Sequence, residues 1–284
     1  MKYKTINYNI ISRYGLPELS RRLRHADIAA IDLDDCLYPR NSHVELTKNL
    51  FLDLPYSYQR LADLRLMLRV VRGLALALCY LAGKIFRTHV SNRFLLEEYE
   101  QVMRNMPVRY FDKCAAELPR NAYNGTREVV KALSERMPVG IITVGFDMVV
   151  GQFMKQFVAG VNMKVSFIDA NKAVFSEYDG EKLYNGFARE NPVITAEDKW
   201  RHLKQRLEEY KSRRPLIIGH RADEILMARH ARELGGLSIG FNPDIDVEGE
   251  FDVIIKAKDW TPILDLLDTA FLKGEKSPSE EKNE

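Results

Sequence analysis

The chain has 284 residues, of which 46% are hydrophobic and 29% are charged, as is typical of globular proteins. Its formal net charge of +2 is too small to indicate a nucleic-acid-binding protein. The N-terminus lacks the long apolar core of a signal peptide, and no apolar run approaches the roughly 20 residues that a membrane-spanning helix needs. Three widely separated cysteines form no metal-binding motif. We therefore expect a reducing, cytoplasmic environment.

A short apolar run near the N-terminus precedes a cluster of acids. Residues 1–27 form a basic lead-in with a short helix around residues 20–24, and Ile28–Ile31 then predicts a buried strand. Asp32 and Asp34 follow it, and both can face the same way because side chains alternate along a strand. Two such carboxylates repel each other unless a divalent cation lies between them or one is protonated. Both solutions are more common in active sites than in scaffolds, and the alternative is an acidic turn that closes the strand.

Residues 42–120 are predicted to be helical and to form an inserted domain. Apolar residues recur every three or four positions from Leu61 to Ala82, and a second helix fits Leu95 to Met106. Cations outnumber acids between Arg60 and Arg93. This indicates a solvated basic face, or alternatively a surface for an anionic partner such as lipid headgroups at a membrane. His43 and His89 have no spacing partner, and we interpret both as structural.

Strands and helices alternate from residue 121 onward. Strands are predicted at 138–143, 163–168, 215–219, 237–240 and 253–255, and helices at 126–135, 147–158, from 196, 222–234 and 260–271. Extended segments after residue 168 are predicted to turn at Asp179–Gly180, and Thr195–Asp198 resembles a capping box at a helix start. This alternation predicts an α/β fold with a doubly wound parallel sheet. We expect a core of residues 1–41 and 121–272, the helical insertion 42–120, and a disordered tail of residues 273–284.

Polar residues recur where the carboxyl ends of the predicted strands would meet. Thr143 ends the second strand and precedes Val144 and Gly145, Lys199 lies in the first turn of a helix, and Gly219–Glu224 ends a later strand. Ligands of doubly wound sheets bind at this edge. Each signal is weak alone, but their common position predicts one site.

The motifs resemble those of the haloacid dehalogenase superfamily of phosphohydrolases, and in particular its phosphoserine-phosphatase-like branch. Asp32–Cys36 is similar to the first motif, Asp-x-Asp-x-Thr, with Cys36 in the threonine position. Ile141–Phe146 is similar to the second motif and Lys199 to the third. The family inserts a helical cap between its first two motifs, where residues 42–120 lie in this chain.

The resemblance implies a phosphomonoester hydrolase that acts on a small organic phosphate. Asp32 would be the nucleophile and form an aspartyl-phosphate, and Asp34 would be the general acid and base. Thr143 and the nearby backbone N–H groups of Val144 and Gly145 would hold the phosphoryl oxygens, and Lys199 would offset charge. Mg²⁺ would be held by Asp32 and by the backbone carbonyl of Asp34.

The fourth motif departs from the family pattern. The pattern Gly-Asp-Gly-x-Asn-Asp is replaced by Gly219-His220-Arg221-Ala222-Asp223-Glu224, so His220 takes the place of an acidic metal ligand. Asp223 would then reach the metal directly, or His220 would favour a softer ion such as Mn²⁺. Glu224 would support the metal or orient Lys199, and Arg221 would bind substrate or block it. The alternative is a catalytically impaired relative that acts as a phosphate-ligand binding or regulatory module.

Overall fold

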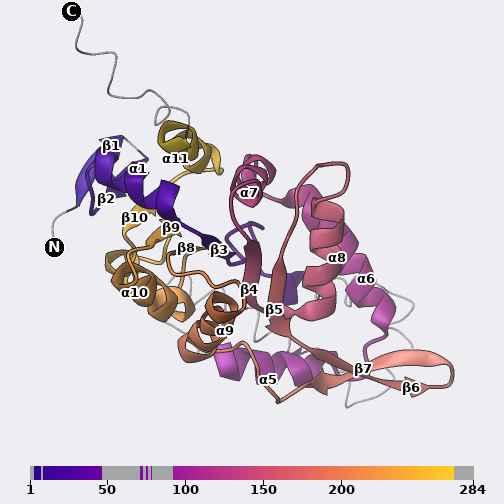
Figure 1. The fold of residues 1–284 in the computed structure, drawn as a ribbon. Coiled ribbons are helices and arrows are strands. Elements are labelled where there is room, and N and C mark those ends of the chain that lie inside the picture. Colours follow the sequence, from indigo (N-terminus) through magenta and orange to yellow (C-terminus); the bar gives the residue numbers. More distant parts are fainter. Residues whose placement is uncertain are drawn as a thin grey trace, which may run out of the picture.

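The computed structural model describes residues 3–7, 9–46, 71, 72, 75, 78 and 92–271. Its centre is an eight-stranded sheet in the order β1-β2-β10-β9-β8-β3-β4-β5, and β6 and β7 form a separate hairpin (Figure 1). The strands are β1 (Lys4–Asn7), β2 (Ile10–Ser12), β3 (Ile28–Ile31), β4 (Val139–Phe146), β5 (Phe167–Asn171), β6 (Ala173–Tyr178), β7 (Glu181–Phe187), β8 (Pro215–Gly219), β9 (Leu237–Phe241) and β10 (Val253–Ile255).

Helices cover both faces of this sheet. They are α1 (Leu16–His25), α5 (Asn92–Met103), α6 (Val108–Glu117), α7 (Thr126–Ser134), α8 (Asp147–Phe157), α9 (Ala196–Glu209), α10 (Ile225–Glu233) and α11 (Thr261–Phe271), with short 3₁₀ turns at Leu118–Asn121, Ala222–Glu224 and Glu248–Glu250. Residues 42–46 are also helical. Among the described residues, no helix combines the length and the apolar composition that a bilayer crossing requires.

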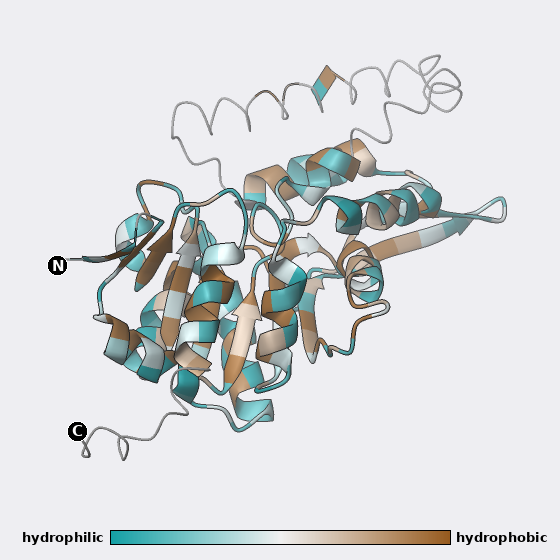
Figure 2. Ribbon diagram, turned by 90° about the horizontal axis from the view of Figure 1, so that it is seen from above, coloured by the Kyte–Doolittle hydropathy of each residue, from teal (hydrophilic) through white to brown (hydrophobic). Residues whose placement is uncertain are grey.

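The central strand shows why the sheet is covered on both faces. All four residues of β3 are buried. Ile28 and Ala30 belong to the apolar cluster on the side of α9 and α10, whereas Ala29 and Ile31 belong to the larger cluster that includes α1, α7 and α11. A strand that is apolar on both faces needs a helical layer on each side. Figure 2 shows the apolar residues gathered along the strands between the helices.

The predicted doubly wound parallel sheet is confirmed, with two additions. The strands from β10 to β5 are all parallel, whereas β2 pairs with β10 and β1 with β2 in antiparallel directions. The analysis of the sequence missed β1 and β2 because their alternation is short and lies within a basic segment.

Two strand boundaries were also predicted wrongly. The strand expected at 163–168 is β5, Phe167–Asn171. A Cβ atom at Gly140 of β4 would lie 2.2 Å from the ring of Phe167. The glycine therefore leaves room for this aromatic ring at the start of β5. β4 was expected to end at Thr143 but continues to Phe146, with an irregular register against β5 between Ile142 and Phe146.

The chain order reverses on either side of β3. This strand pairs in parallel with β4 on one side and with β8 on the other. The chain continues from β4 to β5 in one direction, and from β8 to β9 and β10 in the opposite direction. Such a topological switch point opens a crevice at the carboxyl ends of the strands. The residues that follow β3 and β8 therefore meet residues of β4.

Part of the predicted insertion packs against the hairpin and α8. The ring centroid of Phe111 on α6 lies 5.3 Å from that of Tyr184 on β7 and 6.0 Å from that of Phe146 at the end of β4. The hairpin turns at Asp179–Gly180, as predicted, and extends beside α5 and α6 (Figure 1). The predicted basic helix lies largely outside the described residues, as does the predicted disordered tail, residues 273–284.

Four residues of the helix predicted between Leu61 and Ala82 are described, and all four are helical and exposed. They are Val71, Arg72, Ala75 and Leu78. The guanidinium of Arg72 forms an ion pair with Glu98 on α5. Val71 and Leu78 belong to the apolar stripe predicted along this helix, yet they are 59% and 65% exposed. The described part of that stripe therefore does not lie in the core.

Asn171 ties the end of β5 to the end of β4 and to the loop before α9. Its amide nitrogen donates to the carbonyls of Val144 (2.7 Å) and Val193 (2.8 Å), and its amide oxygen accepts from the Val193 N–H at 3.0 Å. We expect Asn171→Ala to lower the free energy of unfolding by about 2–4 kcal/mol, because it leaves buried backbone groups without partners. Urea denaturation would measure this. Asn162→Ala, at an exposed position, is the control, and an equal effect of the two substitutions would contradict the assignment.

Candidate active site

The carboxylates after β3 are fixed by a tight loop. The Asp32 N–H donates to the Ile218 carbonyl of β8 at 3.0 Å, and Asp35 turns the chain with a φ of 55°. Cys36 is fully buried in this loop, and its carbonyl accepts a hydrogen bond from the Trp260 ring nitrogen at 3.1 Å. The thiol lies 3.8 Å from the Ile218 carbonyl. The loop is therefore held to the core from both sides, and Asp32 and Asp34 emerge at its edge.

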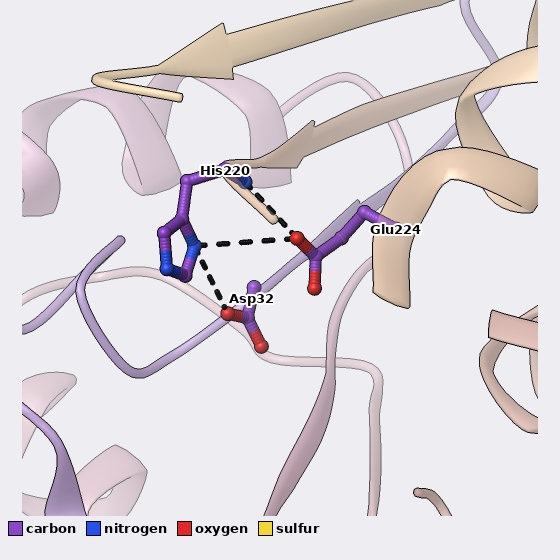
Figure 3. A group of neighbouring side chains, drawn as sticks. All are labelled: Asp32, His220 and Glu224. Carbon is purple, nitrogen blue, oxygen red and sulfur yellow. Dashed lines mark hydrogen bonds and ion pairs between the residues drawn. The ribbon is translucent and has the colours of Figure 1, made fainter. Parts of the chain in front are cut away.

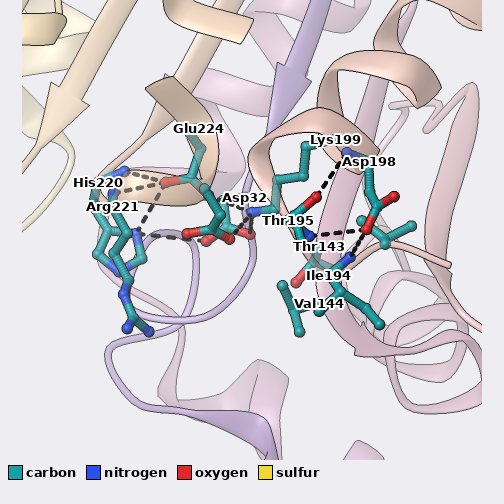
Figure 4. Close-up of polar contacts among 12 residues, drawn as sticks. Asp32, Thr143, Val144, Ile194, Thr195, Asp198, Lys199, His220, Arg221 and Glu224 are labelled. Carbon is teal, nitrogen blue, oxygen red and sulfur yellow. Dashed lines mark hydrogen bonds and ion pairs between the residues drawn. The ribbon is translucent and has the colours of Figure 1, made fainter. Parts of the chain in front are cut away.

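Lys199 lies at the centre of three buried carboxylates. Its ammonium nitrogen is 3.0 Å from Asp32 Oδ1 and 2.8 Å from Asp223 Oδ2, and it also pairs with Glu224 Oε1. The lysine is completely buried. It comes from the first turns of α9, where the Thr195–Asp198 capping box forms as predicted and fixes the start of the helix. Figure 4 shows this network between β3, α9 and the end of β8.

The charges in this cluster do not balance. Burial alone lowers the pKa of a lysine, but the neighbouring carboxylates of Asp223, Asp32 and Glu224 outweigh burial and raise the pKa of Lys199 well above its usual value. For Asp32, burial raises the pKa, and the attraction of Lys199 does not cancel this effect. One ammonium thus faces three carboxylates. A further positive charge in the pocket would stabilise the ionised form of Asp32.

Glu224 shapes the loop after β8. Its Oε2 accepts the backbone N–H groups of His220 (3.1 Å) and Arg221 (2.7 Å), while its Oε1 binds Lys199. This side chain packs under Gly219, where a Cβ would come within 2.5 Å of Glu224 Cγ. Because both carboxylate oxygens are engaged, Glu224 orients Lys199 and the loop, which was one of its two predicted roles.

Asp34 is held by a residue that the sequence analysis did not select. Ser42 donates its N–H to Asp34 Oδ1 and its hydroxyl to Asp34 Oδ2, each at 2.9 Å. Burial outweighs these hydrogen bonds and raises the pKa of Asp34 to about 7. A carboxyl with this pKa can donate and accept a proton near neutral pH. The available signal was Asn41, whose side chain caps the helix that begins at Ser42.

The second motif lies across the pocket from these acids. Thr143 is 1% exposed, and its hydroxyl oxygen accepts the Gly145 N–H at 3.3 Å. Thr143 and Val144 line the pocket, whereas Gly145 is not part of the lining that the described residues form. Gly145 approaches Ser42 closely, since a Cβ at this position would lie 3.5 Å from the Ser42 hydroxyl. It therefore contributes close packing next to Asp34.

His220 points toward the nucleophile candidate. Its Nδ1 lies 3.5 Å from Asp32 Oδ2 and 4.0 Å from Glu224 Oε2 (Figure 3). Burial lowers the pKa of His220 to about 3, so the imidazole is neutral. Neither ring nitrogen has a hydrogen-bond partner among the described residues, and both are buried. This side chain therefore has coordination capacity that no neighbouring group satisfies.

Asp223 and Arg221 complete the loop of the fourth motif. Burial alone would raise the pKa of Asp223, but Lys199 and Arg221 outweigh burial and hold it below its usual range. Asp223 is therefore ionised. The Arg221 Nε lies 3.7 Å from Asp244 Oδ2, and both Arg221 and Asp223 line the pocket. Arg221 thus brings a cation to the pocket without filling it.

These residues line a pocket that opens to solvent. Seven residues predicted from the sequence line this pocket: Asp32, Asp34, Thr143, Val144, His220, Arg221 and Asp223. Lys199 and Glu224 lie behind it. The remaining lining residues, which the sequence analysis did not select for this site, are Asn41, His43, Leu95, Leu96 and Tyr99.

The donor set fits a divalent cation. Asp32, His220 and Glu224 each offer a ligand atom within 4.8 Å of one another. Because Glu224 is fully hydrogen-bonded, the carboxylates of Asp32 and Asp223 and the unpartnered imidazole of His220 are the better ligands. Carboxylates suit Mg²⁺ and Mn²⁺, whereas an imidazole ligand favours transition metals over Mg²⁺.

The position of Lys199 leads to a test of the charge cluster. We expect Lys199→Met to lower the free energy of unfolding by about 3–5 kcal/mol, because it leaves three carboxylates buried without their counter-charge. Chemical denaturation at neutral pH would measure the loss. Lys204→Met replaces an exposed lysine on the same helix and serves as the control. A loss below about 1 kcal/mol in Lys199→Met, the usual size for a surface ion pair, would show that the ammonium is not the counter-ion.

No family model matches the sequence, and no curated protein matches it. Solved structures do match. A phospho-aspartyl intermediate analogue of phosphoserine phosphatase has a TM-score of 0.61 at 16% identity, over 84% of this chain and 98% of that chain. Cytosolic 5'-nucleotidase IIIB bound to cytidine has a TM-score of 0.63 at 13% identity, over 95% of each chain.

A HAD family hydrolase from Salmonella enterica serovar Typhi has a TM-score of 0.61 at 14% identity, over 85% of this chain and 71% of that chain. The similarity to phosphoserine phosphatase agrees with the branch predicted from the motifs. At these identities the similarity concerns the fold. The chain therefore has the fold of the haloacid dehalogenase-type phosphatases, and the resemblance predicted from its motifs is confirmed at that level.

Proposed function

We propose that this protein is a metal-dependent phosphomonoester hydrolase that acts on a small organic phosphate through an aspartyl-phosphate. One observation carries the proposal. The carboxylate of Asp32 enters the pocket with one oxygen fixed by Lys199 at 3.0 Å, while Asp34, with a pKa raised to about 7, lines the same pocket. A held nucleophile beside a titratable acid is what the transfer of a phosphoryl group to a carboxylate needs.

In the first step, a carboxylate oxygen of Asp32 attacks phosphorus. The bond between phosphorus and the ester oxygen breaks, and its electron pair leaves with the alcohol. The protonated form of Asp34 transfers its proton to that oxygen, so a neutral alcohol departs and Asp34 becomes ionised. Thr143 and the backbone beside Val144 hold the phosphoryl oxygens, and Lys199 keeps Asp32 oriented.

In the second step, a water molecule attacks the phosphorus of the aspartyl-phosphate. Asp34, now ionised, accepts a proton from this water. The bond between phosphorus and the Asp32 oxygen breaks and returns the carboxylate. Inorganic phosphate leaves, and Asp34 again carries a proton, so the protein ends the cycle unchanged. The Ser42 hydrogen bonds keep Asp34 in place through both steps.

The residues that would hold the divalent cation are Asp32, Asp223 and His220. Mg²⁺ is the ion that the family resemblance implies, and the imidazole of His220 supports Mn²⁺ or another softer ion instead. When bound, such a cation supplies charge that offsets the negative oxygens of the phosphoryl group. The excess of carboxylates over ammonium groups in the cluster supports this requirement.

The domain division belongs to the same proposal. Residues 1–41 and 121–272 would form the catalytic core, and residues 42–120 would form a cap that covers the pocket. The positions of Leu95, Leu96 and Tyr99 in the pocket lining support a cap that contributes to substrate binding.

The experiment that tests the function is hydrolysis of phenyl phosphate with Mg²⁺, Mn²⁺ or Co²⁺, and after chelation of divalent ions. We expect turnover that depends on the metal, and a loss of at least roughly 10³-fold in Asp32→Asn because the amide is not a nucleophile. Asp112→Asn, at an exposed position on α6, should retain full activity. Circular dichroism would confirm that each variant is folded.

Two outcomes would contradict the proposal in different ways. Equal turnover in Asp32→Asn would remove the proposed nucleophile. Binding of phosphate without turnover, measured by a shift in thermal unfolding, would favour the alternative of a phosphate-ligand binding or regulatory module.

The choice of metal rests on His220. We expect the wild-type protein to bind Mn²⁺ more tightly than Mg²⁺, and His220→Asp to reduce that preference by roughly 10-fold, because a carboxylate replaces the nitrogen ligand. Isothermal titration calorimetry with each ion would measure the ratio without reference to activity. His25→Asp adds the same negative charge at an exposed site and serves as the control. An unchanged ratio in His220→Asp would show that the imidazole is not a ligand.

A further inference from the structure

One wall of the pocket differs in character from the charged cluster. Leu95, Leu96 and Tyr99 project from α5, and His43 lies beside them, with its ring centroid 5.5 Å from that of Tyr99. Burial lowers the pKa of His43 to about 4, so this ring is neutral near pH 7. The described residues of this wall therefore carry no charge.

The hydroxyl of Tyr99 is an unused donor in this wall. Tyr99 is 4% exposed, and its hydroxyl oxygen is buried without a hydrogen-bond partner among the described residues. Burial raises the pKa of Tyr99 to about 12, with a smaller contribution from the charge of Asp34, so the group keeps its proton. A buried donor without a partner is destabilising, and an acceptor on a ligand would relieve this cost.

The position of the wall assigns it to the leaving group. Asp34 transfers its proton to the departing alcohol in the proposed reaction, and Ser42, which binds Asp34, directly precedes His43. Tyr99 and Asp34 line the same pocket. The organic part of the substrate therefore extends from the proton donor along His43, Tyr99 and the two leucines.

An amino-acid leaving group does not match this wall. The α-amino and carboxylate groups of phosphoserine would each need an oppositely charged partner when buried. Arg221 is the cation among the described lining residues, and its side chain is held toward Asp244 on the loop after β9. The lining carboxylates, Asp32, Asp34 and Asp223, belong to the reaction centre.

We propose that the substrate is the phosphate ester of an uncharged alcohol with an apolar or aromatic body, and that the Tyr99 hydroxyl donates to an acceptor on that body. This inference rests on the proposed phosphomonoesterase activity. It makes Tyr99 a specificity-determining residue and distinguishes this pocket from one built for phosphoserine.

The test compares benzyl phosphate, its 3- and 4-methoxy derivatives and O-phospho-L-serine. We expect kcat/KM for benzyl phosphate to exceed that for O-phosphoserine by roughly 10-fold or more, because the described residues of the wall offer no charged partner for an ammonium group. The kcat/KM for at least one methoxy ester should exceed that for benzyl phosphate. In Tyr99→Phe, the ratio of kcat/KM for that methoxy ester to kcat/KM for benzyl phosphate should fall by roughly 5–30-fold, so that the gain is lost.

Tyr184→Phe is the matched control. Its hydroxyl is also buried without a partner among the described residues, but it lies on β7 outside the pocket lining. This variant should keep the wild-type order of substrates. Equal or better use of O-phosphoserine, or a Tyr99→Phe variant that keeps the methoxy gain, would overturn the inference while the phosphatase stands.

Binding of the same esters to Asp32→Asn, measured by calorimetry, separates the two proposals. Wild-type protein that hydrolyses none of the esters with any metal would remove the proposed function. Selective binding of benzyl esters in that case would keep the pocket's preference for uncharged bodies. Binding without selectivity would remove both.

Discussion

The site depends on one buried ammonium group. Lys199 reaches from α9 to the sheet edge and holds three carboxylates from two loops, those of Asp32, Asp223 and Glu224. Without it, these acids would repel one another in a region of low dielectric constant. Because one ammonium group faces three carboxylates and burial raises the pKa of Asp32, a further positive charge would stabilise the ionised form of Asp32. The same interaction thus stabilises the fold of the site and, in the proposed function, favours a metal there.

The parallel sheet makes this arrangement rigid. β3 is hydrogen-bonded on both sides, and the Asp32 N–H continues the pairing with β8. Gly219 leaves room for Glu224 under the strand end, and Glu224 then fixes the backbone that carries His220. Each residue that faces the pocket is therefore positioned by one behind it. Such support is needed to keep a nucleophile in a productive orientation.

The sequence predicted the features that depend on local patterns. The apolar runs of β3 and β8, the capping box before Lys199 and the motifs at the strand ends follow from short periodicities and from chemistry that few residue types provide. The roles of Ser42 and Tyr99 could not be predicted in the same way. They arise from contacts between segments distant in the sequence, or from a loop whose path no local sequence pattern determines. β1 and β2 were missed for a similar reason, since pairing with β10 rather than their own pattern makes them strands.

The two walls of the pocket come from different parts of the chain. In the proposed function, one part would carry out catalysis and the other would recognise the substrate. The charged wall comes from the sheet edge, where a shift of one residue would break the Lys199 network. The uncharged wall comes from α5 and the start of the helix at residue 42, where the ring of His43 packs against Tyr99 of α5 and against Phe146 at the end of β4. In the proposed function, the insertion would therefore select the alcohol, while the core would catalyse its departure.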